Sequence, residues 1–368
     1  MSIRRFIPLK DTFIVEAAGG SDESNFGKDE ILELGAVESS SAQGLSEILM
    51  QFSQEDLKTV PEITAGLPYV ARLHLYLANI KNVPDDEYTI CTARVEEDWS
   101  EGLGSVAAWG DLSGATWTYP KSTGDKWNLD RTERKAEACV TYSPDRPCPD
   151  LTLDVTSIVE DWVSGAHSNY GLWIWIAEES VSQVEGYGTE LFYYSKDTHT
   201  VYRPYLEIAW DDSTYEGEGP KTDKFRVRGI NLRESYSDRD YVTFDFGTVA
   251  SYPTRAFSTS SIYSDIRSLP SGTLWGIKDE YTNEMVVDFD PEYTKLSSTE
   301  EESFLNLNIG DTLYPERYYR LLLKVPQQVR TENSEYVSDI TKMRVVDNKY
   351  IFKITRYGGS RKAAGIHS

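Results

Sequence analysis

Two hydrophobic periodicities meet in residues 153–176, LDVTSIVEDWVSGAHSNYGLWIWI. The apolar positions of its first half have helical spacing and are Val155, Ile158, Val159, Trp162 and Val163. Asp154 is placed to cap the first turn of this helix, and Gly165 can end it in a left-handed conformation. The run LWIWIAEE that follows is typical of a strand. The pattern predicts a short helix that packs Trp162 against a sheet and leads into the next strand.

Short apolar or alternating segments separated by turn signals make up the rest of the chain. In the first half they are DTFIVE, EILELGAV, SEILMQFSQ, YVARLHLYLANI, YTICTARV, TELFYYSK and PYLEIAW. In the second half they are KFRVRGI, YVTFDFG, TLWGIKD, EMVVDFD, ESFLNLNIG, ERYYRLLLKV and KYIFKITR. Many short strands of this kind favour an all-β fold. We expect an N-terminal jelly-roll β-sandwich with one short helix and a C-terminal Ig-like or fibronectin-like β-sandwich.

A seam between the two halves lies at residues 210–224, WDDSTYEGEGPKTDK, which are rich in acidic residues, Gly and Pro. Only Trp275 of the nine tryptophans follows it, so the two halves have differently built cores. The predicted domain order is an N-terminal docking segment (1–10), the jelly roll (11–211), a linker (212–223), the Ig-like sandwich (224–358) and a flexible basic tail (359–368).

The net charge of −23 argues against a nucleic-acid partner, because a polyanion needs a dense basic face. No apolar run approaches the length of a membrane span, and the N-terminus lacks the apolar core of a secretory signal. We therefore expect folding in a cytoplasm and no membrane partner. The three cysteines, Cys91, Cys139 and Cys148, are expected to be free thiols. A bridge between Cys139 and Cys148 would close only a short loop.

Catalytic motifs are not found. The four histidines have no metal-ligand spacing, and neither a hydrolase elbow nor a phosphate loop occurs. The acidic turns at 84–87 and 288–292 offer clustered oxygens that could bind calcium, but such turns are common without an ion. The sequence thus predicts no catalytic residue, no cofactor and no metal site.

The order of motifs resembles the DNRLRE domain, a carbohydrate-binding-module-like family. The residues that carry the resemblance are DTFIVE…SNFGKDEILELG, ARLHLYL, VEEDWSEG…ATWTYP and TLDVTSIVEDWVSG…NYGLWIWI…ELFYYSK…PYLEIAW, over residues 11–211. Long insertions around VAAWGDLSGATW and RKAEACVTYSPDRPC depart from the family pattern. The resemblance implies a jelly roll that binds or scaffolds and does not catalyse. It also implies that Trp99, Trp117 and Trp162 are core residues, with stacking on sugar rings as the alternative.

In the second half, FLNLNIGDTLYPERYYRLLLKV…KYIFKITR resembles Ig-like domains of tailed-bacteriophage virion proteins. The opening RRFIPLKDTFI is similar to the first residues of phage structural proteins, which dock onto a neighbouring subunit. This likeness makes Arg4, Arg5 and Phe6 the candidate docking residues.

A second candidate surface is the tyrosine-rich stretch YYSKDTHTVYRPY, because tyrosines beside an arginine suit a protein interface or a stacked sugar. The candidate contact residues are Tyr193, Tyr194, His199, Tyr202 and Arg203. Alternate tyrosines that fill the sandwich core are the other interpretation.

The predicted function is that of a non-enzymatic structural protein of a tailed-phage virion, at the tail, neck or capsid vertex. Its expected partners are other virion proteins and further copies of itself, its expected location is the particle, and its mechanism is burial of assembly interfaces. The alternative function is a carbohydrate-binding or host-adhesion module on a virion or cell surface, with a glycan as ligand.

Overall fold

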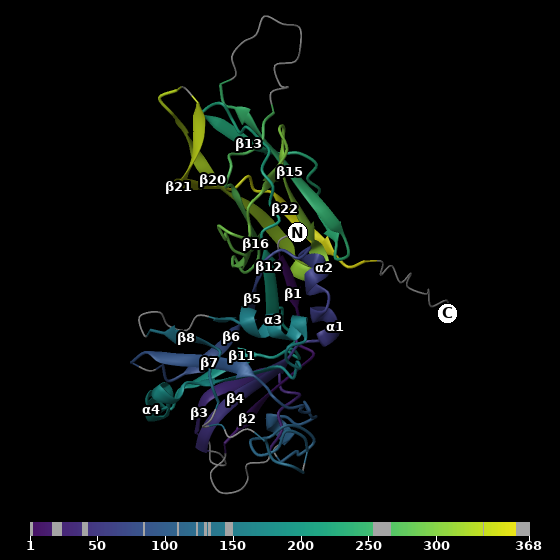
Figure 1. Ribbon diagram of the computed structural model, residues 1–368, viewed down its shortest axis with the longest axis vertical. Helices are drawn as coiled ribbons and strands as arrows, with labels where there is room; N and C mark the ends of the chain where they lie inside the picture. The colour runs from purple at the N-terminus through teal and green to yellow at the C-terminus, as the bar shows by residue number, and fades with distance from the viewer. Residues whose placement is uncertain are drawn as a thin grey trace, which may run out of the picture. The chain divides into compact units, whose positions relative to one another are not determined.

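The computed structural model of the chain is shown in Figure 1. It describes residues 3–16, 24–38, 43–83, 85–108, 110–122, 124–128, 131, 134–143, 150–252, 266–333 and 335–357. The fold is all-β, as predicted, and the chain divides into two compact units. One unit comprises Arg5–Ile208, and the other comprises Met1–Arg4 together with Ala209–Ser368.

The N-terminal unit is a β-sandwich with a four-stranded sheet (β1-β12-β5-β9) and an eight-stranded sheet. The order of the larger sheet is β6-β11-β3-β4-β10-β7-β8, and β2 pairs with β4. Its strands and helices are β1 (Ile3–Phe6), β2 (Lys10–Val15), β3 (Ile31–Glu38), β4 (Gln43–Gln51), α1 (Gln54–Leu57), α2 (Val60–Ile63), β5 (Tyr69–Leu75), β6 (Leu77–Lys81), β7 (Tyr88–Arg94), β8 (Ala138–Tyr142), β9 (Leu151–Asp154), α3 (Thr156–Ser164), β10 (Leu172–Ile176), α4 (Glu178–Tyr187), β11 (Glu190–Tyr194) and β12 (Tyr205–Trp210).

Helix α3 confirms the helix predicted from the apolar spacing. The predicted cap is displaced by one residue: Val155 is the N-cap and makes no side-chain cap hydrogen bond, while Oδ1 of Asp154, just before it, accepts the backbone N–H of Thr156 at 3.0 Å. Gly165 ends the helix in the left-handed region, at φ 77°. Trp162 is buried, and its helix leads through a turn into β10. Beyond the strand, the AEE residues that continued the strand pattern instead begin helix α4, where Glu178 and Glu179 in the first turn favour a helix N-terminus.

The N-terminal residues form a strand of the chain's own sheet, and this corrects their assignment as a docking segment. Strand β1 is a neighbour of β12 in the smaller sheet. Phe6 is buried, and the guanidinium of Arg5 pairs with the carboxylate of Glu207 at 2.9 Å. Arg4 is partly buried. An aromatic ring and a guanidinium that already have partners inside the chain are not available to a neighbouring subunit.

The free-thiol prediction is wrong for two of the three cysteines, because Cys91 and Cys139 form a disulfide. They are directly opposed residues on the antiparallel strands β7 and β8, which the sequence separation of 48 conceals. Cys148 lies outside the described residues. The argument for a reducing compartment no longer holds, since disulfides persist in oxidising surroundings.

The C-terminal unit is a second β-sandwich, with sheet orders β13-β15-β19-β18 and β14-β22-β20-β16-β17, and with β21 paired to β20. Its elements are β13 (Phe225–Gly229), β14 (Ser235–Ser237), β15 (Tyr241–Ala250), β16 (Leu274–Asp279), β17 (Met285–Val287), β18 (Ser297–Ser298), β19 (Ser303–Asn308), α5 (Ile309–Thr312), β20 (Tyr318–Arg330), β21 (Tyr336–Val346) and β22 (Ile351–Thr355). Its core contains Trp275, Phe244 and Phe352.

Residues 212–223, predicted as a free linker, are partly held by this second unit. Tyr215 forms an isolated parallel bridge with Ser298, and its hydroxyl donates to the carbonyl of Leu269 at 2.8 Å. Gly217 lies so close to Ser268 that a Cβ atom at residue 217 would meet the Ser268 Oγ at 2.0 Å. The glycine that looked like linker composition therefore allows a close approach of the backbone. The predicted basic tail (359–368) lies outside the described residues.

None of the helices in the described part of the chain is both long and apolar enough to cross a membrane.

Candidate ligand pocket on the large sheet

The alternation of strand β10 places its two tryptophans on one face of the large sheet. Trp173 and Trp175 are two residues apart and share a face, while Leu172, Ile174 and Ile176 occupy the opposite one. Both tryptophans pack in a cluster with Leu49 of β4 and Cys91 of β7. The same cluster includes residues from the segment between β7 and β8: Val95, Trp99, Ala115, Trp117 and Trp127. This long insertion therefore forms an additional layer over the sheet.

The carboxylate of Glu47 lies at the base of this layer and is almost fully buried, with 5% of its side chain exposed. The indole N–H of Trp173 donates to its Oε2 at 2.6 Å. Arg134 donates to both carboxylate oxygens, at 2.6 and 3.0 Å. Arg131 lies 3.4 Å from Oε2 through its Nε. A buried carboxylate is tolerated only with such partners, so Glu47 joins the sheet to the insertion.

Guanidinium groups and indole rings alternate above Glu47. Arg131 lies over the ring of Trp117, with 4.0 Å between its Cζ and the ring centroid, and Arg134 lies 4.5 Å from the centroid of Trp175. The ring centroids of Trp127 and Trp173 are 4.8 Å apart. Burial lowers the pKa of Arg131, and Glu47 opposes that effect. Two guanidinium groups share one buried carboxylate, so the base of the site carries an excess of positive charge.

A cavity of about 710 Å³ opens beside these stacked guanidinium groups and indole rings. Its walls combine the flat sides of Trp117, Trp127 and Trp175 with the disulfide between Cys91 and Cys139. The charged side chains that line it are Glu16, Glu47, Lys126, Arg131, Arg134, Glu178 and Glu179. A concave site with flat aromatic walls and a few polar groups is the usual form of a small-molecule site. Trp127 and Trp117 are partly exposed and can contact a ligand.

Asn25 fixes the insertion at the side of the sheet. Its side-chain N–H groups donate to the carbonyls of Glu101 and Ala115 at 2.7 and 2.9 Å, and its Oδ1 accepts the N–H groups of Gly27 and Gly104. Asn25 is fully buried, and its contacts with Glu101, Ala115 and Gly104 join residues 24–28 to the insertion. The SNFG residues of the family resemblance therefore have a structural role here.

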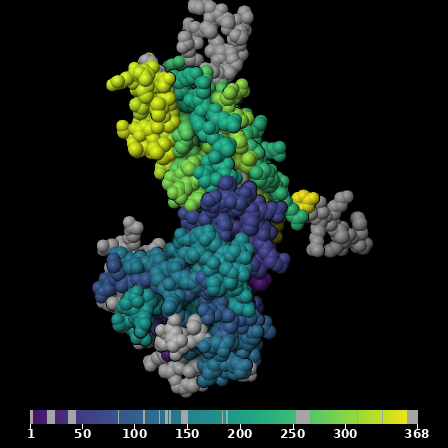
Figure 2. Space-filling model, in the orientation of Figure 1, coloured from purple at the N-terminus to yellow at the C-terminus, as the bar shows by residue number. Residues whose placement is uncertain are grey.

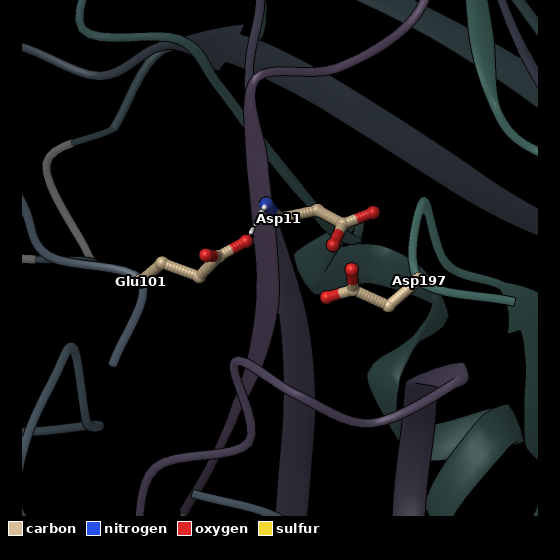
Figure 3. Close-up of side chains that lie close together, drawn as sticks. All are labelled: Asp11, Glu101 and Asp197. Carbon is tan, nitrogen blue, oxygen red and sulfur yellow. Dashed lines mark hydrogen bonds between the residues drawn. The ribbon is translucent and has the colours of Figure 1, made fainter. Parts of the chain in front are cut away.

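Three carboxylates meet near this anchor. Oxygen atoms of Asp11, Glu101 and Asp197 all lie within 4.8 Å of one another, and Figure 3 shows the three side chains converging. Lys196 supplies the positive charge between them, with its Nζ 2.8 Å from Glu101 and 2.9 Å from Asp197. Lys28 adds a second ammonium, 2.9 Å from Glu101. The arrangement is a network of ion pairs that ties β2 to the insertion and to the loop after β11.

Burial raises the pKa of Asp11 to about 7, even though the backbone N–H of Lys196 donates to its Oδ2 at 2.7 Å. Desolvation by the surrounding protein is the largest cause, because the side chain is fully enclosed. Burial thus disfavours the ionised form of the Asp11 carboxyl in the folded chain.

The tyrosine-rich candidate surface is only partly available. Tyr193 is 1% exposed, because it points into the sandwich on the same side of β11 as Leu191, so its assignment as a contact residue is corrected. Tyr194 and Tyr202 are half-buried and stack on each other with ring centroids 5.5 Å apart. The side chain of His199 is 89% exposed, and Arg203 is exposed too. Of the five candidates only these two are exposed, and His199 Nε2 lies 3.5 Å from the carboxylate of Glu30, so the set does not form one continuous contact face.

The tryptophan interpretation is confirmed for Trp99 and Trp162, which are both buried at 1% exposure. Trp117 is only partly buried and lines the cavity. The acidic turn at 288–292 binds its own backbone, since Oδ1 of Asp290 accepts the N–H groups of Glu292 and Tyr293. In the other turn, Asp85, Asp86 and Glu87 are exposed and Pro84 lies outside the described residues.

The tryptophan pocket, which is the cavity lined by Trp117, Trp127 and Trp175, was not predicted from the sequence. The signal for it was the W-x-W spacing of β10, which sets two indoles side by side, together with R-x-x-R in the insertion. Nothing in the linear sequence placed Glu47 of β4 between them.

No protein-family model matches the chain, and no curated protein is similar to it in sequence. Among solved structures, the glycoside hydrolase domain Endo-D of Streptococcus pneumoniae R6 is 9% identical, with 93% of this chain and 38% of that chain covered and a TM-score of 0.16. A structure described as a receptor binding domain is 7% identical, with 98% and 90% covered and a TM-score of 0.17. The binding domain of botulinum neurotoxin DC in complex with rat synaptotagmin II is 7% identical, with 98% and 91% covered and a TM-score of 0.18. The chain thus spans well under half of the first of these, and at such TM-scores none of them informs the fold or the function.

Proposed function

We propose that the protein is a non-enzymatic binding protein whose N-terminal sandwich holds a saccharide in the tryptophan pocket. The observation that carries the proposal is the cavity of about 710 Å³ with the indoles of Trp117, Trp127 and Trp175 in its walls. Aromatic rings give a sugar ring a flat apolar surface for stacking. Buried or half-buried charged groups beside them can hydrogen-bond hydroxyl groups and fix the orientation of the ligand.

The chemistry of the pocket favours binding over turnover. Glu47 is the buried carboxylate of the site, and it is fully engaged by Trp173 and Arg134. A general acid has to reach the leaving group, whereas both oxygens of this carboxylate accept hydrogen bonds from side chains of the protein. The proposal therefore assigns the pocket no reaction. Release of reducing ends from a bound polysaccharide would overturn that part of it.

A panel of soluble polysaccharides tests the proposal. Affinity electrophoresis of the full chain through gels that contain laminarin, xylan, pectin, alginate or a bacterial capsule preparation reports retardation. We expect retardation by at least one of them, and loss of it in Trp127→Ala. Tyr252→Ala is the matched control, because Tyr252 is an 81% exposed aromatic residue of the other unit. Retardation that survives Trp127→Ala, or its absence across a broad glycan array, would refute a saccharide site in this pocket.

Assembly in a virion is a second proposal, and one observation favours it. Strand β21 pairs with β20 at an edge of the C-terminal unit and belongs to the larger yellow area at the upper left of Figure 2. Val337, Ile340 and Val345 of this strand are 52%, 65% and 56% exposed. Exposed apolar side chains on one strand suit a protein–protein contact. Mass spectrometry of particles purified from a lysate that expresses the chain should detect it in fixed proportion to the coat protein, and particles without it would contradict this role.

A further inference from the structure

The disulfide forms part of the wall of the tryptophan pocket and closes the segment that builds it. Cys91 and Cys139 both line the cavity. The chain between them contains the insertion with Trp117, Trp127 and Arg131. The bond thus lies where the two ends of the insertion meet the sheet.

The strand on the far side of this bond, β8, is an edge strand held by its five-residue ladder with β7 and by the side-chain pairs Thr89–Thr141 and Tyr88–Tyr142. Strand β8 is the last of the large sheet, and among the described strands β7 is the one that it pairs with. Arg94 of β7 and Glu137, just before β8, add a bidentate ion pair, but both side chains are partly exposed. An edge strand that pairs on one side is the part of a sheet that opens most readily.

The bond is also open to reagents on one side. Cys139 is exposed, whereas Cys91 is buried at 3% exposure. A thiolate can therefore reach the sulfur of Cys139 first. Exposed disulfides are the ones that exchange readily with thiols.

We propose that the Cys91–Cys139 disulfide is a redox control of the pocket, so that the oxidised chain binds its ligand and the reduced chain does not. This inference rests on the proposed function, because it concerns the same site. In the reducing step, one thiolate of a dithiol reductant attacks Sγ of Cys139 and breaks the S–S bond. Cys91 leaves as a thiolate and takes up a proton. The second thiol of the reductant then displaces Cys139 as a thiol, and the reductant becomes a cyclic disulfide.

The loss of binding follows from the contacts of the insertion. Once the bond is open, β8 can separate from β7 and draw the arginines that precede it away from both Glu47 and the indoles. The guanidinium groups of Arg131 and Arg134 then leave Trp117 and Trp175, and the cavity loses a wall. If the closed state falls to about a tenth of the population, the apparent dissociation constant rises about tenfold.

Acrylamide quenching of tryptophan fluorescence tests whether reduction opens the pocket, and it needs no ligand. The full chain is compared in four forms, all in a Cys148→Ser background so that only one cysteine pair is present. The forms are oxidised, reduced by dithiothreitol, reoxidised, and a Cys91→Ser/Cys139→Ser variant. We expect a higher quenching constant in the reduced form and in the double variant, with full recovery on reoxidation. Equal quenching in all four forms would overturn the proposal. Far-UV circular dichroism shows which forms keep the sandwich, and the reversible cycle decides the outcome if the double variant does not fold.

Affinity electrophoresis tests whether reduction abolishes ligand binding. It uses the polysaccharide gel that retards the oxidised chain. We expect the retardation to disappear in the reduced chain and to return on reoxidation. Opening of the pocket on reduction with unchanged retardation would overturn the redox control while leaving a saccharide site elsewhere. Opening of the pocket in a chain that no polysaccharide retards would leave the redox opening intact and refute the proposed function instead.

Discussion

The indole N–H of Trp173 and the carboxylate of Glu47 form a buried hydrogen bond of 2.6 Å between neighbouring strands of the large sheet. Around this pair, two arginines from the insertion stack on three indoles. The sheet contributes the acid and two of the rings, while the insertion contributes both guanidinium groups. The pocket therefore exists only when the insertion lies on the sheet.

Replacement of Glu47 tests this relationship. Glu47→Ala removes the carboxylate that Arg134, Arg131 and the indole N–H of Trp173 share in a largely buried site, so we expect a loss of about 3–5 kcal/mol in the free energy of unfolding. Urea denaturation followed by far-UV circular dichroism measures it. Glu332→Gln is the control, because Glu332 is an exposed residue of the other unit and should change stability by less than about 0.5 kcal/mol. A Glu47 variant as stable as the control would contradict the account.

Removal of the disulfide should also weaken the N-terminal unit. A bridge that closes a loop of 48 residues contributes about 4 kcal/mol in the loop-entropy model. We expect the Cys91→Ala/Cys139→Ala variant to unfold at a lower urea concentration, by an amount close to that seen when the wild type is reduced. Calorimetry should assign the shift to the transition of the N-terminal unit. A shift in the transition of the C-terminal unit instead would contradict the assignment of the disulfide to the N-terminal unit.

The free energy of unfolding should depend on pH through the titration of Asp11. Its folded-state pKa is about 7 against an ordinary value of 3.8, so the folded chain holds this proton more tightly than the unfolded chain. Stability from this group is therefore present below about pH 4 and falls as the pH rises to about 7. The Glu33 carboxyl, also raised to about 7 by burial, acts in the same direction.

The variant Asp11→Asn isolates that contribution, because its amide oxygen can still accept the N–H of Lys196. We expect the variant to gain about 2–4 kcal/mol relative to the wild type between pH 4 and pH 8. Unfolding free energies at several pH values measure the difference. Parallel pH profiles of the two proteins would show that Asp11 titrates normally.

Asn25 should contribute to stability through its hydrogen bonds to buried backbone groups. In Asn25→Ala, the buried carbonyl of Ala115 and the N–H of Gly104 lose their partner. We expect a loss of about 2–4 kcal/mol and faster hydrogen exchange in residues 101–115. Asn348→Ala is the control, since Asn348 is exposed in the C-terminal unit. Unchanged exchange in the insertion would mean that Asn25 does not anchor it.

Most of the fold could be predicted from the hydrophobic periodicity of the sequence. Helix α3 was predictable because its apolar residues are local, and so were the strands whose side chains alternate between faces. The register of β7 against β8 was not, because strand pairing is a long-range property, and this is why Cys91 and Cys139 looked unpaired. The N-terminal strand was missed for the same reason: its pairing with β12 and the contact between Arg5 and Glu207 join residues about 200 positions apart.

The site was less predictable than the fold. Each strand places Glu47, Trp173 and Cys91 on a face that the sequence can suggest, but their meeting depends on the order of strands in the sheet. The tyrosines were chosen by composition alone, and alternation along β11 sends Tyr193 into the core.

The central claim is that a saccharide binds in the tryptophan pocket, and the most direct test is the indole region of a ¹⁵N spectrum. The full chain has nine tryptophans, and Trp275 lies alone in the core of the C-terminal unit as an internal reference. Addition of a polysaccharide that retards the chain should shift the indole signals of Trp117 and Trp127 and leave that of Trp275 in place. Shifts that avoid these two signals, or no shift at saturation, would contradict the claim.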